Sequence, residues 1–197
     1  MIRTVRHIVP IVICNLLLTG NAAAQRVNFG LYATEDIVIT PLDLGELNFN
    51  AKQMMIMTGQ TVAINLLDES TAVLAITGRR DQDFTVTVDA PVSLDLDTLH
   101  IPLNLRYAYS NMGATNNTQA KQTSVVVPAG FTSVTFPVLR RASGLPAPPP
   151  TPNHAGYVAP TGTVYFFIYG ILGPVPLNAI AGPYSGQINI HVSYSVN

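Results

Sequence analysis

Apolar and polar residues alternate one by one in several segments, and this period of two restricts the fold of the chain more than any other feature. The clearest alternation covers residues 84–88, 101–109 and 188–194. Successive side chains of a β-strand point to opposite faces of a sheet, so each segment would have one apolar face and one largely polar face. We therefore predict half-buried strands. Further strands are predicted at 37–40, 53–57, 61–67, 71–77, 123–127, 131–139 and 163–169.

Turn-forming residues separate these segments, and no window of helical length has a sustained helical pattern. Many short strands without helices between them indicate antiparallel pairing, because a parallel crossover usually contains a helix. The sequence therefore predicts an all-β fold, a single antiparallel β-sandwich of immunoglobulin-like type over residues 37–197. Within it we expect an exposed polar loop at 111–122 and a Pro-rich loop at 140–160, where proline cannot donate to a ladder.

The first 24 residues have the pattern of a secretory signal peptide. Two arginines, Arg3 and Arg6, precede an apolar run at 8–18, and three alanines follow at 22–24. The apolar run is too short to cross a bilayer as a stable helix. We expect residues 1–24 to be removed and the mature protein to be secreted, without a stable membrane span. A retained anchor and a lipidation site at Cys14 are the less favoured alternatives.

The composition of the mature chain excludes two classes of partner and one means of stabilisation. Cys14 is the only cysteine and lies in the predicted signal peptide, so no disulfide can hold the mature fold. Without the two arginines of the leader, eight basic residues remain against eleven acidic residues. Nucleic acids and anionic lipids require clusters of basic residues. We therefore expect no nucleic-acid partner and no electrostatic membrane binding.

No metal-binding pattern emerges. The mature chain has three histidines, which are His100, His154 and His191. None lies two or four residues from another, so the sequence does not predict a zinc site. Two pairs of carboxylates lie two residues apart, Asp81 with Asp83 and Asp95 with Asp97. Neither pair is part of a complete calcium-binding loop, and we expect solvated turn and edge residues instead.

Catalysis is not predicted either. Ser185 lies between two glycines, Gly182 and Gly186, but the segment precedes a strand and lacks the G-x-S-x-G spacing of a hydrolase. We interpret it as a hairpin turn. With no base next to a candidate nucleophile, we expect neither catalytic residues nor a cofactor, and we do not expect an enzyme.

Three segment pairs together resemble a known family. They are 37–40 with Leu-Gly-Glu-Leu-Asn-Phe at 44–49, 72–78 with 84–88, and Gly-Pro-Tyr-Ser-Gly at 182–186 with 188–194. In these segments the chain is similar to a bacterial family of exported proteins, catalogued as a domain of unknown function and related to spore-coat-protein-U and chaperone–usher pilin domains.

This resemblance implies a pilin-like sandwich and a structural or adhesive role rather than catalysis. A protein of this kind would pass through the periplasm and reach the cell surface or a fimbrium. It would be a fimbrial or pilus-type subunit that assembles by strand addition. Its implied partners are a neighbouring surface subunit or a second copy, together with a periplasmic chaperone and an outer-membrane usher.

The N-terminal extension at 25–36 has the pattern of a donor strand. Apolar residues at alternate positions suit a groove with spaced pockets, and they are Val27, Phe29, Leu31 and Ala33. We hypothesise that this segment binds a neighbouring subunit. The alternative is that it adds an edge strand to its own sheet.

A carbohydrate- or matrix-binding β-sandwich module is the second function class. An aromatic platform could be formed by four tyrosines, which are Tyr107, Tyr109, Tyr165 and Tyr169. Packing in the core or on the sheet face is the favoured explanation for tyrosines at strand positions, and the absence of tryptophan further weakens the carbohydrate interpretation.

Overall fold

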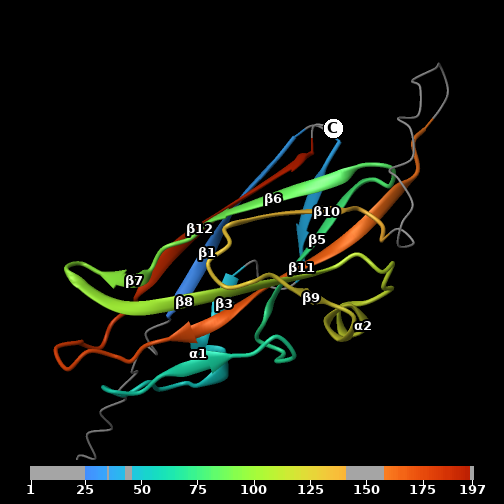
Figure 1. Cartoon of the computed structure of the whole chain (residues 1–197). Helices are drawn as coiled ribbons and strands as arrows, with labels where there is room; N and C mark the ends of the chain where they lie inside the picture. Colours follow the sequence, from blue (N-terminus) through green and yellow to red (C-terminus); the bar gives the residue numbers. More distant parts are fainter. Residues whose placement is uncertain (1–24, 35, 43–45, 141–157, 196–197) are drawn as a thin grey trace, which may run out of the picture.

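The structure is a computed structural model that describes residues 25–34, 36–42, 46–140 and 158–195. The predicted signal peptide lies outside the described residues, as do His154 and most of the Pro-rich loop. The described residues form mainly β-strands, which confirms the all-β prediction (Figure 1). The strands are β1 (Arg26–Ala33), β2 (Val38–Pro41), β3 (Glu46–Asn48), β4 (Val62–Ile64), β5 (Ala72–Arg79), β6 (Asp83–Asp89), β7 (Ser93–Leu96), β8 (Leu99–Ser110), β9 (Val125–Val126), β10 (Ser133–Pro137), β11 (Thr161–Leu172) and β12 (Ser185–Tyr194). Two short helices are α1 (Phe49–Lys52) and α2 (Asn117–Gln122).

The strands form one curled, mixed sheet with two central strands. In one half, β12 lies between β1 and β6, and β3 and β10 lie beyond these neighbours. In the other half, β11 lies between β5 and β8, and β2 and β9 lie beyond them. The long strand β8 joins the halves, because its first residues pair with β7 and residues from Leu103 onward pair with β11.

The prediction of purely antiparallel pairing was wrong for one pair of strands. β1 runs parallel to β12, from Arg26 opposite Ser185 to Ala33 opposite Val192. The rule that parallel strands need a helical crossover applies to strands that follow each other along the chain. Here the first strand pairs with the last one, and all the intervening strands serve as the connection.

The predicted alternation is confirmed where it was clearest. In β6 the apolar residues Phe84, Val86 and Val88 are buried, and in β12 the same holds for Ile188, Ile190 and Val192. Their polar neighbours are exposed or half-buried. Burial of these alternate aliphatic and aromatic side chains supplies the main favourable term for folding a chain without disulfides.

The strand β11 is apolar on both faces, and the segment predicted as an exposed loop at 111–122 helps to cover one of them. This segment contains α2, whose Ala120 is fully buried. Ser110 of β8 lies opposite Tyr165 of β11, and its Oγ lies 2.9 Å from Oγ1 of Thr123 just after the helix. Most of this segment is exposed, as predicted, but the prediction missed the helix, which is capped by a polar residue, Asn116, and has only one buried position.

The strand predicted at 53–57 does not form. The chain after α1 instead makes hydrogen bonds between side-chain amides and its own backbone. The amide of Gln53 donates to the carbonyl oxygen of Met55 at 2.8 Å, and the side-chain oxygen of Gln60 accepts from the backbone N–H of Met57 at 3.0 Å. These local bonds replace the ladder that a strand would need.

Candidate functional site

The four residues of the predicted donor segment lie on β1. Val27 is fully buried, Phe29 and Leu31 are half-buried against the core, and Ala33 is exposed at the end of the strand. Asn28 and Tyr32, at intervening positions, are exposed. The structure therefore places one of the four apolar side chains in the core of its own chain and packs two others against that core.

β1 is paired along its whole length with β12. The register is unbroken from Arg26 to Ala33, and backbone hydrogen bonds continue it at both ends. Arg26 N–H donates to the carbonyl oxygen of Tyr184 and Thr34 N–H donates to that of Val192, both at 3.2 Å. This is the arrangement of the alternative hypothesis, an edge strand in its own sheet. Binding of the segment to a neighbour stays a prediction, and it requires β1 to leave β12.

Side chains on the outward face reinforce this pairing. The rings of Tyr32 and His191 are stacked, with centroids 4.7 Å apart. Beside them, Gly30 is covered by the side chains of Gln187 and Asn189, which are hydrogen-bonded to each other at 2.9 Å. A Cβ atom at Gly30 would lie 2.6 Å from Oδ1 of Asn189, so only glycine fits without displacing this pair.

On the other edge of β1, the described strands pair with only part of its length. β3 pairs with Arg26, Val27 and Asn28, and no described strand pairs with residues 29–33 on that side. The N–H groups of two even-numbered residues point toward the β12 side: Arg26 donates to Tyr184 just before β12, and Thr34 donates to Val192 in β12. Since backbone groups of successive strand residues point to opposite edges, the N–H and C=O groups of Phe29, Leu31 and Ala33 point to the outer edge.

This outer edge lacks the proline that protects the edges of two other outer strands, β2 and β10. β2 contains Pro41 and β10 contains Pro137. The residue after each proline donates its N–H inward, Leu42 to Val73 and Val138 to Gln82. Because successive N–H groups of a strand point to opposite edges, each proline occupies a position whose N–H would point outward. Proline and charged residues at such positions prevent another strand from pairing. Residues 29–33 contain neither proline nor a charged residue.

The four tyrosines of the predicted aromatic platform do not form one. Tyr165 and Tyr169 are buried, and Tyr107 stacks on Phe166 with ring centroids 6.0 Å apart. Burial raises the pKa of Tyr107 to about 12. Tyr109 stacks on Phe136 of β10, with ring centroids 4.0 Å apart. Their positions thus match the alternative of packing inside the sheet.

Among the described residues, histidine and carboxylate side chains do not gather in one place. Nδ1 of His100 lies 2.7 Å from Oδ1 of Asp95, and this hydrogen bond lowers the pKa of Asp95. Asp81 is less exposed than expected for a solvated turn residue, because its Oδ2 forms an ion pair with Nη2 of Arg79 at 3.3 Å. Within the described part of the chain, no three histidine, cysteine or acidic side chains lie together as a metal site.

The residues that the structure describes include no helix long and apolar enough to span a membrane.

Sequence reasoning missed a cavity at the end of the molecule that carries α1. Its volume is about 540 Å³, and it lies between residues 50–58 and the segment 175–184. Three methionines line it, Met54, Met55 and Met57, together with apolar residues and Tyr184. The run Met-Met-Ile-Met in the sequence is the signal that could have indicated it.

Comparisons with known proteins add no relative: no family model matches the chain, and no curated protein matches it.

Proposed function

We propose that this protein is a secreted structural or adhesive surface protein, a fimbrial or pilus-type subunit that assembles by strand addition. The observation that carries the proposal is the outer edge of β1 at residues 29–33, which is neither paired by a described strand nor protected by proline or charge. The proposal includes export through the periplasm to the cell surface or a fimbrium. It also includes a pilin-like sandwich, supported by the passage of β8 from one half of the curled sheet to the other.

An extended strand from a neighbouring subunit would find two kinds of contact at this edge. The outward N–H and C=O groups of Phe29, Leu31 and Ala33, which no described strand pairs, offer backbone hydrogen bonds, each worth about 0.5–1.5 kcal/mol net. The half-buried side chains of Phe29 and Leu31 offer apolar surface at alternate positions. Backbone bonds supply affinity in strand addition, and alternate side chains supply register.

The partner in this proposal is a second copy of the chain or a neighbouring surface subunit. A periplasmic chaperone would cover the same edge during export, and an outer-membrane usher would exchange the chaperone for the next subunit. Covering the edge in transit is physically useful because an open, uncharged edge strand favours uncontrolled aggregation.

A single substitution at the outer edge tests the proposal. Leu31→Pro removes an outward N–H, while Gly30 and Tyr32 keep the backbone groups that face β12. We expect negative-stain electron microscopy of the purified variant to show no filaments. The matched control is Thr135→Pro on β10, an outward position of an edge that Pro137 already protects. Filaments should form normally in the control, and circular dichroism should show that both variants are folded. Normal filaments from folded Leu31→Pro would overturn the proposal.

The donor-segment hypothesis needs a separate test. Deletion of residues 25–33 removes Val27, Phe29, Leu31 and Ala33 together. Fibres formed by the purified deletion variant would rule out a donor role for these residues. Because Val27 is fully buried, the deletion also exposes part of the core, so the folded state of the variant must be verified first.

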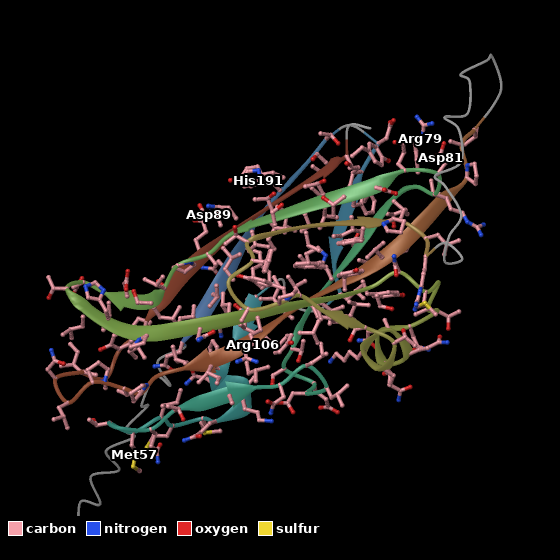
Figure 2. All side chains as sticks on the ribbon, viewed as in Figure 1. Met57, Arg79, Asp81, Asp89, Arg106 and His191 are labelled. Carbon is pink, nitrogen blue, oxygen red and sulfur yellow. The ribbon has the colours of Figure 1, made fainter. Side chains whose placement is uncertain are left out.

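A second candidate function is binding of carbohydrate or matrix through the outward face of β1, β12 and β6. Here the exposed stack of Tyr32 on His191 lies beside paired hydroxyl groups, Thr87 with Ser133 and Thr85 with Thr135. Figure 2 shows His191 and Asp89 on this side of the molecule. The test is retention on polysaccharide resin, which Tyr32→Ala should abolish if the face binds glycans and leave unchanged if it does not.

A further inference from the structure

Three exposed methionines are concentrated in four residues of sequence. The residues Met54, Met55 and Met57 are 80%, 71% and 59% exposed, although methionine is among the residues most often buried. All three line the same cavity, at the end of the molecule where Figure 2 labels Met57. The three methionines therefore border one hollow and are accessible from solvent.

Hydrogen bonds fix the backbone that carries these side chains. The carbonyl oxygen of Met54 accepts from the amide of Asn50 at 3.3 Å, and that of Met55 accepts from the amide of Gln53 at 2.8 Å. Met57 is held on both sides by Gln60, whose side chain accepts from its N–H and whose backbone N–H donates to its carbonyl oxygen, each at 3.0 Å. The loop is thus held in place while the flexible thioether groups are left to adapt to a ligand.

The chemistry of the cavity favours a soft ion of low charge. Thioether sulfur is a soft, neutral ligand that selects Cu(I) over hard cations such as Ca²⁺ and Mg²⁺. None of the residues that line the cavity carries a charged side chain, so the site offers no carboxylate to compensate a divalent ion. We propose that Met54, Met55 and Met57 form a binding site for a soft monovalent cation of the Cu(I) type.

This site is independent of the proposed assembly edge. The expectation of no metal site concerned histidines and carboxylates, and it did not consider thioether sulfur. An apolar docking surface for a peptide would also place methionines in a hollow, but such a surface would not need sulfur. Leucine in place of methionine keeps the apolar surface and removes the sulfur, and it therefore separates the two possibilities.

The test uses Ag⁺ as an air-stable soft monovalent probe, added to the exported chain in a chloride-free buffer. The protein carries ¹³C-labelled methionine methyl groups, so each methionine reports separately by NMR. We expect saturable shifts of the methyl signals of Met54, Met55 and Met57. Met112 is the internal control, because it is 47% exposed and lies outside the cavity. Absence of shifts, or shifts of Met112 equal to those of the three, would overturn the proposal.

Variants complete the test with a readout of affinity. The triple variant Met54→Leu, Met55→Leu, Met57→Leu should lose saturable Ag⁺ binding in isothermal titration calorimetry, whereas Met112→Leu should bind as the unmodified chain does. All four positions are exposed, so folding should be retained. Binding of the triple variant with unchanged affinity would show that sulfur at these positions is not the ligand and would contradict the proposal.

Discussion

Tyr32 on the first strand stacks on His191 of the last strand, with the ring planes 10° apart. The two residues also lie directly opposite each other in the parallel ladder between β1 and β12. This contact joins the N-terminal strand to the C-terminal strand on the outward face, while Val27 joins them in the core. β12 occupies one side of β1, and on the opposite side β3 pairs only with Arg26–Asn28, so no described strand pairs with residues 29–33 there.

The stack should contribute measurably to stability. Tyr32→Ala and His191→Ala each remove one ring, and the double variant removes both. We expect a coupling free energy of about 1 kcal/mol between the two positions in urea unfolding, the usual range for an aromatic pair. Strictly additive effects of the two substitutions would show that the stack contributes nothing beyond the contacts of each ring alone.

Gly170 should tolerate no side chain. It lies in β11 opposite Leu105, and a Cβ atom there would overlap the backbone oxygen of Asn104. Backbone cannot rotate away as a side chain can, so Gly170→Ala should lower the free energy of unfolding by about 1–3 kcal/mol. The control in the same strand is Gly162→Ala, where the nearest atom is a methyl group of Val138 at 3.1 Å. Equal losses in thermal unfolding of the two variants would contradict this explanation.

The ionised carboxylate of Asp68 should stabilise the folded state at neutral pH, and this stabilisation should be lost at acidic pH. Its carboxylate accepts from Nζ of Lys52 at 2.7 Å and from the N–H of Asn65 at 2.8 Å, and chiefly the lysine bond lowers its pKa from 3.8. A pKa lower in the folded state than in the unfolded state means that the stabilisation is present above the unfolded value of 3.8 and is lost as the pH falls through the folded value.

The measurement for Asp68 is urea unfolding of Asp68→Asn at neutral pH and at about pH 3. The variant should be less stable than the unmodified chain at neutral pH, and the difference should shrink at acidic pH. Glu69→Gln is the matched control, since Glu69 forms no ion pair with any described residue. A difference that stays constant across this range would show that the charge of Asp68 is not the cause.

Tyr107 should make the fold sensitive to alkaline pH. Burial raises its pKa from 10.0 to about 12, so the neutral phenol is favoured in the folded state. Its contribution is fully present below pH 10 and is lost as the pH rises through about 12. Tyr107→Phe should therefore reduce the loss of stability in this range. The check is chemical unfolding at rising pH, and an unchanged alkaline loss in the variant would contradict the assignment to Tyr107.

Local patterning predicted most of the strands but not their partners. The alternation in β6, β8 and β12 is a property of neighbouring residues, and it appears directly in the sequence. The parallel pairing of β1 with β12 depends on residues at opposite ends of the chain, which local periodicity does not relate. Burial of α2 likewise depends on the apolar outer face of β11, far from it in the sequence.

The sequence likewise predicted the local part of the candidate site, the inward side chains of β1, but not the pairing of its outer edge. Alternation in 25–33 identified which side chains of β1 point inward, and Val27, Phe29 and Leu31 do so. That no described strand pairs with residues 29–33 on the outer side follows from the register of β3, and no pattern in 25–33 contains that register. The roles of Pro41 and Pro137 also become visible only once the direction of their missing N–H groups is known.

Hydrogen–deuterium exchange of single amides in β1 tests the central claim most directly. In the monomer, the outward amides of Leu31 and Ala33 should exchange quickly, while those of Gly30 and Tyr32, which face β12, should exchange slowly. After assembly, Leu31 and Ala33 should become as protected as their neighbours, because an added strand accepts their hydrogen bonds. Outward amides that exchange as quickly in the assembled protein as in the monomer would contradict strand addition at this edge.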